Sequence, residues 1–257
     1  MHNSKISIDY SLNSLKDFPI VETENYIIRL ALNNEELESI FRLRFQVFNL
    51  ELGLGYSSSY LTQMDQDEFD AVWHHLILID KETDKIIGSY RMQTYSMASQ
   101  ALGFYADQYF NLSQINDSLL QVTVEIGRAC IAKEYRTIQA LSLIFKGLAN
   151  YLAWSGNQYF LGCASLPTQS HYKACCAYDY FQQNDFMHPD ILLYPKSQCS
   201  LELPQYCPDS SDVEIPNILQ LYLASGAKVC SLPSIDRQFK CIDFLIMFDG
   251  ANFCRWQ

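Results

Sequence analysis

The segment VTVEIGRAC, residues 122–130, constrains the fold most, because it places two charged residues inside a stretch that otherwise looks like a buried strand. An unpaired buried charge costs several kcal/mol, so such residues are normally paired or tied to a function. Side chains alternate along a strand, which would send Glu125 and Arg128 to opposite faces. We predict a bulge at Gly127 that resets the alternation and lets both side chains face one cleft.

A bulge at Gly127 would also free a backbone N–H that could stabilise an oxyanion. The alternative is a buried Glu–Arg pair with only a structural role, because buried ion pairs also perturb pKa values.

The charge balance bears on the class of substrate. The chain has 18 Lys and Arg against 29 Asp and Glu, a net charge of −11. A nucleic-acid-binding protein needs a basic face for phosphate contacts, so this class is disfavoured. The balance fits a small cationic or zwitterionic substrate.

Length and apolar content predict one substantial core. The chain has 257 residues, 49% of them hydrophobic, and its longest apolar runs are far shorter than the roughly 20 residues of a membrane span. The N-terminus has no basic region followed by an apolar stretch, so we expect a cytoplasmic protein. Peripheral contact with the inner membrane face stays open. The nine cysteines are expected to be reduced thiols, mostly in the core.

The order of elements predicts a mixed α/β fold in one domain over residues 26–250, after an irregular lead-in at 1–25. Asn33 and Thr137 have the residue types that cap helices, and Gly156 is suited to end one. The expected elements are strands at 26–32, 74–80, 86–95, 122–130, 159–165 and 241–248, and helices at 33–48, 137–156, 171–183 and 216–226.

An ordered series of short motifs runs along this domain. The motifs include Arg44-x-x-Val-Phe48, Asp65-x-Asp67-x-Phe69-Asp70, His75-Leu, Gly88-Ser-Tyr-Arg91, Glu125-x-Gly-Arg128, Tyr135-Arg136 and Gly162-Cys-Ala-Ser165. The ordered set resembles the bacterial ornithine N-acyltransferase family, whose members are GNAT-type enzymes related to acyl-homoserine-lactone synthases and to long-chain N-acyl amino acid synthases. The resemblance implies a mixed central sheet flanked by helices, with splayed central strands.

The resemblance implies transfer of a long-chain, often 3-hydroxylated, acyl group to the α-amino group of an amino acid. Ornithine is the leading acceptor, and the product would be a lyso-ornithine lipid. In that reaction Glu125 would act as the general base on the amine, directly or through water, and Arg128 or the N–H groups of the strand would stabilise the carbonyl oxygen. Three alternatives stay open: another N-acyl amino acid such as N-acyl glycine, an acyl-homoserine-lactone synthase, and a non-enzymatic acyl-carrier binding module.

The implied donor is the phosphopantetheine thioester of acyl carrier protein, with no resident cofactor. Acyl-CoA is the alternative donor, but the segment IAKEYRTIQA, residues 131–140, lacks the glycines with which acetyl-CoA enzymes bind pyrophosphate. Gly127, Lys133 and Arg136 are expected to contact the carrier or its pantetheine.

The implied acceptor site draws on the acidic segment and its neighbours: Arg44, Asp67, Asp70, His75 and Arg91. Acidic groups would hold the amine and an arginine the carboxylate. A metal site is not expected. The acidic segment lacks the glycine and later glutamate of a calcium loop. His171 and Cys175 could supply two zinc ligands from one helical face, but the sequence shows no matching second pair.

Overall fold

A nine-stranded sheet forms the centre of the protein in a computed structural model, which describes residues 15, 17–202 and 214–253. The strand order is β1-β2-β3-β4-β5-β6-β9-β7, with β8 paired to β9. All pairings are antiparallel except that of β5 with β6. The strands are β1 Val21–Glu22, β2 Tyr26–Leu30, β3 His74–Asp80, β4 Lys85–Thr94, β5 Thr123–Ile131, β6 Tyr159–Leu166, β7 Lys228–Val229, β8 Ser234–Asp236 and β9 Cys241–Asp249.

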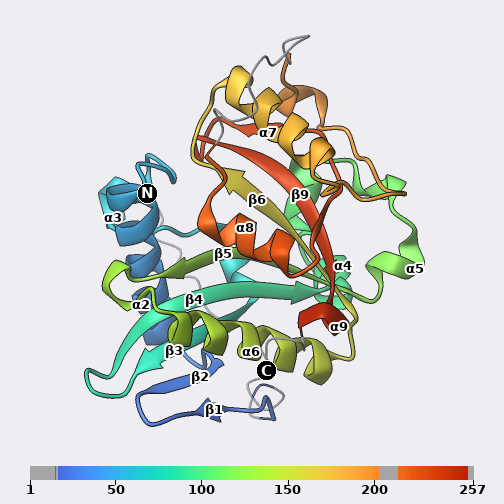
Figure 1. Ribbon diagram of the computed structural model, residues 1–257. Helices are drawn as coiled ribbons and strands as arrows, with labels where there is room; N and C mark the ends of the chain where they lie inside the picture. Colours follow the sequence, from blue (N-terminus) through green and yellow to red (C-terminus); the bar gives the residue numbers. More distant parts are fainter. Residues whose placement is uncertain (1–14, 16, 203–213, 254–257) are drawn as a thin grey trace.

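Helices cover both faces of this sheet (Figure 1). α6, α7 and α8 pack on one face, where alternate strand residues join one apolar cluster. α2 and α4 pack on the opposite face, over the other set of alternate residues. The helices are α2 Asn34–Arg44, α3 Ser59–Thr62, α4 Tyr95–Gln100, α5 Asp117–Leu120, α6 Ile138–Ser155, α7 His171–Gln183, α8 Asn217–Ala224 and α9 Gly250–Phe253, with a π-helix η1 Phe45–Glu51 and 3₁₀ turns η2 Glu68–Ala71, η3 Tyr105–Gln108, η4 Leu112–Gln114, η5 Lys133–Tyr135 and η6 Ser197–Cys199.

The predicted caps fix the starts of α2 and α6. The Asn33 side chain accepts a hydrogen bond from the Glu36 N–H at 2.9 Å, and the Thr137 hydroxyl accepts one from the Ala140 N–H at 3.2 Å. Gly156 ends α6 in the left-handed conformation, with φ 68°. The helical spacing of apolar residues predicts that Ile138, Leu141, Phe145, Leu148 and Leu152 form one buried face of α6. Phe145, Leu148 and Leu152 are buried, but Ile138 is 86% exposed, so the prediction is wrong there.

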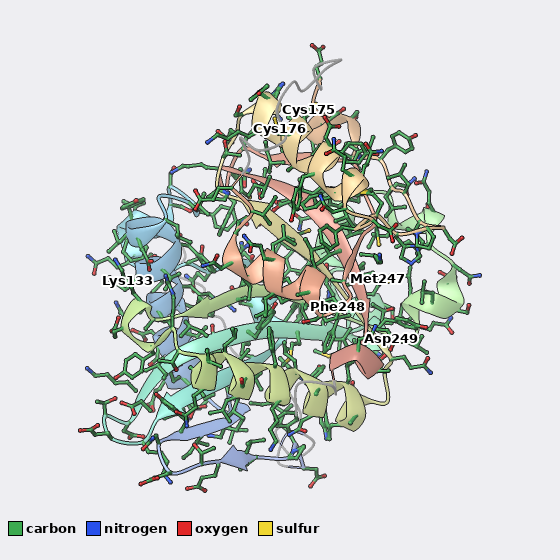
Figure 2. The ribbon with its side chains drawn as sticks, in the orientation of Figure 1. Lys133, Cys175, Cys176, Met247, Phe248 and Asp249 are labelled. Atoms are coloured by element: carbon green, nitrogen blue, oxygen red, sulfur yellow. The ribbon has the colours of Figure 1, made fainter. Side chains whose placement is uncertain are left out.

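Two other expectations need revision. The lead-in at 1–25 is not irregular throughout, because β1 pairs with β2 and Phe18 is buried. Cys176, on α7 (Figure 2), is disulfide-bonded, so the prediction that the cysteines are all reduced thiols is wrong there. The positions of the cysteines along the sequence do not show which thiols lie close together in the fold.

The mixed α/β prediction is confirmed, and the strands expected at 74–80 and 86–95 form the antiparallel pair β3 and β4. None of the helices in the described ranges is long and apolar enough to cross a membrane.

Candidate active site

The two central strands separate part-way along their length and open a cleft. β5 and β6 pair from Thr123↔Tyr159 to Glu125↔Leu161 only, although they run on to Ile131 and Leu166. The predicted splay of the central strands is therefore confirmed. A cleft of about 240 Å³ is lined by residues 126–129 of β5 and 162–165 of β6.

The cleft has an apolar half and a charged half, on opposite faces of the sheet. Lining residues on the α8 side belong to the apolar cluster, and there the Tyr90 and Tyr222 hydroxyls are hydrogen-bonded to each other. The other half is lined by charged and polar residues, including Arg91, Tyr105, Arg128, Ser165, Asp236 and Asp243. Such a cleft can hold an acyl chain next to a charged small molecule.

Two glycines shape the opening in different ways. A Cβ added to Gly162 would lie 2.6 Å from the backbone oxygen of Ile126, so glycine is needed for β6 to approach β5 at this point. A Cβ added to Gly127 would meet nothing within 4 Å. Gly127 therefore leaves open space beside β5, where a ligand could approach the backbone.

A bulge is present in β5, but it lies one residue beyond the predicted position. Gly127 pairs with Arg91 and Cys130 with Ser89, so Arg128 and Ala129 together oppose a single residue of β4. Arg128 itself has the left-handed backbone, with φ 50°. This conformation is uncommon for a residue with a side chain and persists where the surroundings hold it.

The surroundings of Arg128 explain its conformation. Its guanidinium ion-pairs with Asp67 at 3.1 Å and Asp65 at 3.4 Å, and lies 4.3 Å from the centre of the Phe239 ring. It also donates a hydrogen bond to the Tyr56 hydroxyl at 2.9 Å. These contacts lie on the face of β5 to which the bulge turns the side chain.

Glu125 lies on the same face as Arg128, but the two do not form an ion pair. Tyr105 lies between them: its N–H donates to Glu125 at 2.8 Å, and its ring is 5.5 Å from the Arg128 guanidinium. Glu125 also accepts hydrogen bonds from Gln93 and from the Ala106 N–H, both at 2.7 Å. It is buried and, unlike Arg128, is not among the residues that line the cleft.

The pKa of Glu125 suits a proton acceptor. Burial raises it to about 7, although the hydrogen bonds from Gln93, Ala106 and Tyr105 act in the opposite direction. A carboxyl group with this pKa exchanges protons near neutral pH. Its catalytic role stays a prediction.

A buried ion-pair network lies beneath the charged half of the cleft. Asp70 accepts hydrogen bonds from Arg44 at 2.7 Å and from Arg91 at 2.9 Å. Burial alone would raise the pKa of Asp70, but attraction to Arg44 and Arg91 outweighs burial and holds the pKa well below its usual range. Arg91 also pairs with Asp67 at 2.5 Å, so the network balances three arginines against three aspartates: Arg44, Arg91, Arg128, Asp65, Asp67 and Asp70.

His75 completes this network in its neutral form. Burial, together with the nearby Arg44, lowers its pKa to about 3. Arg44 donates to Nδ1 at 3.2 Å, which leaves Nε2–H to donate to the Asp70 carbonyl at 3.0 Å. The five predicted acceptor-site residues therefore do come together, but only Arg91 of the five lines the cleft. The others support the guanidinium groups that reach it.

The thiols of the cleft region are poor nucleophiles. Cys163 lines the cleft, and burial raises its pKa well above the usual value. Burial also raises the pKa of Cys130, whose thiol has the Ser89 hydroxyl as its hydrogen-bond partner at 3.5 Å. Covalent catalysis by cysteine, which needs a thiolate, is disfavoured.

Comparison with known proteins identifies the class of this cleft. Residues 43–146 match the model of the acetyltransferase (GNAT) domain family. The chain is 27% identical over 240 residues to the L-ornithine N(alpha)-acyltransferase of Rhodobacter capsulatus, covering 88% of this chain and 90% of the relative. It is 28% identical over 243 residues to the enzyme of the same name from Brucella abortus, covering 86% and 83%.

The predicted resemblance to ornithine N-acyltransferases is confirmed, and the chain is an N-acyltransferase with a GNAT-like fold. The alternative of a non-enzymatic binding module is set aside. Among solved structures, the chain is similar to the AHL synthase LasI (TM-score 0.49, 11% identity, 89% of this chain and 91% of the other) and to FeeM, an N-acyl amino acid synthase from uncultured soil microbes (TM-score 0.47, 10% identity, 91% and 96%).

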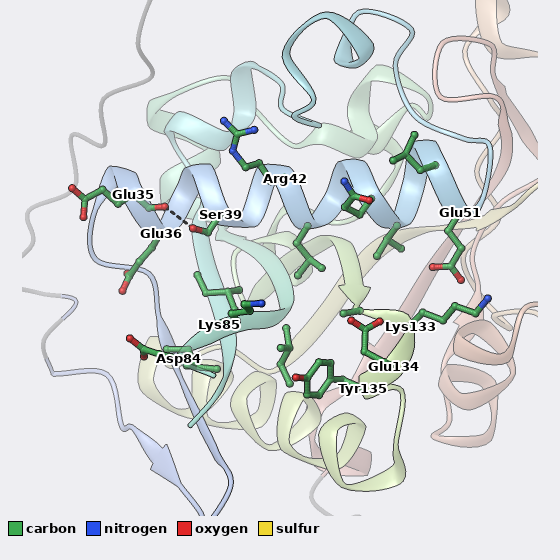
Figure 3. A pocket seen from close by; sticks show the side chains of 18 of the residues that line it. Glu35, Glu36, Ser39, Arg42, Glu51, Asp84, Lys85, Lys133, Glu134 and Tyr135 are labelled. Atoms are coloured by element: carbon green, nitrogen blue, oxygen red, sulfur yellow. Dashed lines mark hydrogen bonds between the residues drawn. The ribbon is translucent and has the colours of Figure 1, made fainter. Parts of the chain in front are cut away.

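Two of the residues expected to meet the acyl carrier, Lys133 and Arg136, lie just before α6, whereas the third, Gly127, lines the cleft. Lys133 lines a surface groove of about 1060 Å³ between the α2–η1 helix and η5 (Figure 3). The groove is lined by four basic and five acidic side chains, so it has no surplus of positive charge. Arg136 donates to both carboxylate oxygens of Glu51, at 2.6 and 2.7 Å, and ties the end of η1 to the α6 start.

Sequence reasoning missed several residues that line the cleft. Tyr105 lies in the short helix η3 and Phe239 in the turn between β8 and β9, and the position of both depends on the whole fold. Asp243 could have been found, because it interrupts the apolar run CIDFLIMF as Glu125 interrupts β5. A charge inside a strand-like run is the same signal at both positions.

Proposed function

We propose that this N-acyltransferase moves a long-chain acyl group, with or without a 3-hydroxyl, from acyl carrier protein to the α-amino group of ornithine. The observation that carries the proposal is the similarity to L-ornithine N(alpha)-acyltransferases over most of both chains. The two halves of the cleft support it, because one substrate is apolar and the other charged. The product would be a lyso-ornithine lipid.

In the proposed reaction the neutral α-amine attacks the thioester carbonyl carbon. A C–N bond forms, the C–S bond breaks, and the pantetheine sulfur leaves and takes up a proton. An α-ammonium group titrates near 8, well below a side-chain amine near 10.4, so a modest base can free it at neutral pH. Selectivity for the α-position then follows from proton affinity.

Glu125 is our proposed base. Since it does not line the cleft, the proton would travel through a water molecule over Gly127, where the missing side chain leaves open space. Arg128 lines the cleft and is the proposed donor to the developing oxyanion. Both roles depend on the bulge, which brings Arg128 to the face of Glu125.

The experiment is an acylation assay with purified protein. Long-chain acyl carrier protein or acyl-CoA would be incubated with single amino acids, including ornithine and glycine, and with S-adenosylmethionine, and products read by mass spectrometry. Acyl-ornithine formed from acyl carrier protein is expected. A lactone from S-adenosylmethionine, or no amide with any amino acid while the carrier binds, would refute the proposed substrates.

Glu125→Gln tests the base. We expect turnover to fall by about 10²- to 10⁴-fold, the usual contribution of a general base. Circular dichroism should show that the variant keeps the fold. Glu82→Gln is the matched control, because Glu82 is exposed in the turn between β3 and β4, outside the cleft lining. Full activity in Glu125→Gln would remove Glu125 from the proposed mechanism.

A further inference from the structure

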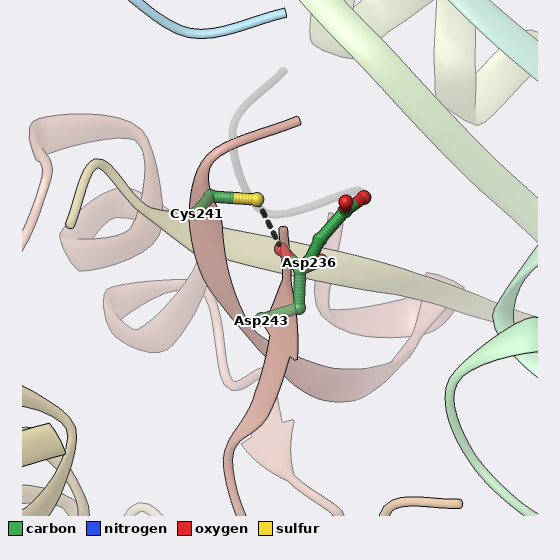
Figure 4. A group of neighbouring side chains, drawn as sticks. All are labelled: Asp236, Cys241 and Asp243. Carbon is green, nitrogen blue, oxygen red and sulfur yellow. Dashed lines mark hydrogen bonds between the residues drawn. The ribbon is translucent and has the colours of Figure 1, made fainter. Parts of the chain in front are cut away.

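Two buried carboxylates occupy the charged half of the cleft and take no part in the reaction steps above. Asp236 ends β8 and Asp243 lies on β9, with Cys241 beside them (Figure 4). All three line the cleft and are at most 3% exposed. One potential ligand atom from each lies within 4.8 Å of the others.

The hydrogen bonds of this group leave one oxygen available. Asp236 is fully engaged: it accepts from the Tyr109 hydroxyl at 2.5 Å and from two backbone N–H groups, those of Gln238 and Phe239, at 2.8 Å. Asp243 Oδ1 accepts from the Ser165 hydroxyl at 2.5 Å and from the Cys241 thiol. Asp243 Oδ2 accepts no hydrogen bond from any described residue.

Neither carboxylate has a cationic partner within the described ranges. Arg128, the cationic side chain that faces them, is already paired with Asp65 and Asp67. Burial raises the pKa of Asp243 to about 6, and repulsion from Asp236 acts in the same direction. The neighbouring network is balanced, so this half of the cleft carries surplus negative charge that a cationic ligand would neutralise.

We propose that Asp236 and Asp243 form a binding site for the side-chain ammonium group of the acceptor amino acid. The proposal rests on the proposed function, in which the acceptor is ornithine. The α-amine must be neutral to attack, whereas the side-chain amine stays protonated at neutral pH and can donate three hydrogen bonds. Asp243 Oδ2 is the open acceptor, and Asp236 adds charge held in place by Tyr109.

An ammonium group suits these residues better than a metal ion does. Cys241 donates a hydrogen bond to Asp243, so its thiol is protonated, and burial raises its pKa well above the usual value. A zinc or cadmium ligand would have to be the thiolate. The hydrogen bonds to Asp236 likewise leave no oxygen without a partner.

The test compares ornithine with norvaline, which has the same carbon chain but no side-chain amine. We expect the wild-type protein to prefer ornithine in kcat/KM, and Asp243→Asn to reduce that preference by on the order of 10- to 100-fold, the range for losing a hydrogen bond to a charged group. Asp236→Asn should act in the same direction. Asp249→Asn is the matched control, the same exchange on the same strand outside the cleft lining, and should keep the preference.

An unchanged ratio in both cleft variants would overturn the proposal, even if both substrates react more slowly. If chelation removes the wild-type preference and zinc restores it, a metal ion is the occupant and the proposal is also overturned. Calorimetry of ornithine and norvaline binding to the wild-type protein needs no variant to fold and no turnover. Equal affinity would refute the ammonium site, whereas tighter binding of ornithine without any amide product would refute only the proposed function.

Discussion

Replacing Gly162 by alanine tests the close approach of β5 and β6 at the start of the cleft. The added Cβ would lie 2.6 Å from the Ile126 carbonyl oxygen and 3.1 Å from its Cγ1. A backbone atom cannot rotate away, so the strands must move apart. Such overpacking costs about 1–3 kcal/mol, and the lower entropy of the unfolded alanine chain offsets about 0.4–1 kcal/mol.

We therefore expect the free energy of unfolding to fall by about 1–2 kcal/mol, which lowers Tm by about 2–8 °C in a protein of this size. Calorimetry would measure Tm, with Gly127→Ala as the matched control. Gly127→Ala has room for its methyl group and no left-handed backbone, so Tm should stay or rise slightly while activity falls as the cleft fills. A Gly162→Ala protein as stable and active as the wild type would show that the strands are not held this closely.

Two further predictions concern buried charge. Asp70→Asn removes the carboxylate shared by two buried guanidinium groups, and should lower the free energy of unfolding by about 3–5 kcal/mol. Urea titration measures this change, with the exposed Asp190→Asn as the control. A loss below about 1 kcal/mol would contradict the prediction. Glu125 has a folded pKa near 7, above the usual value near 4.3, so the folded state binds more protons than the unfolded state between these pH values. The free energy of unfolding should therefore fall by about 3 kcal/mol as pH rises from about 4.5 to 7. Urea titrations across this range should show a flatter dependence in Glu125→Gln, and identical slopes would refute the shift.

Local patterns could predict most of the elements because each has a local cause. Caps such as Asn33 and Thr137 act within one helical turn, and apolar alternation marked the strands. The helical spacing of apolar residues failed at Ile138, which lies on the first turn of α6, beyond the core. Local patterns also did not predict β7 and β8, which are short strands that pair with β9.

The charged residues show where prediction from sequence stops. The motifs brought Arg44, Asp70, His75 and Arg91 to notice together, and the fold does join them, but their distance from the cleft depends on side-chain packing. A buried carboxylate indicates that something must compensate its charge. At Asp70 the compensation is two arginines of the same chain. At Asp243 no described side chain supplies it, so the same physical rule that makes Asp70 structural points to a ligand at Asp243.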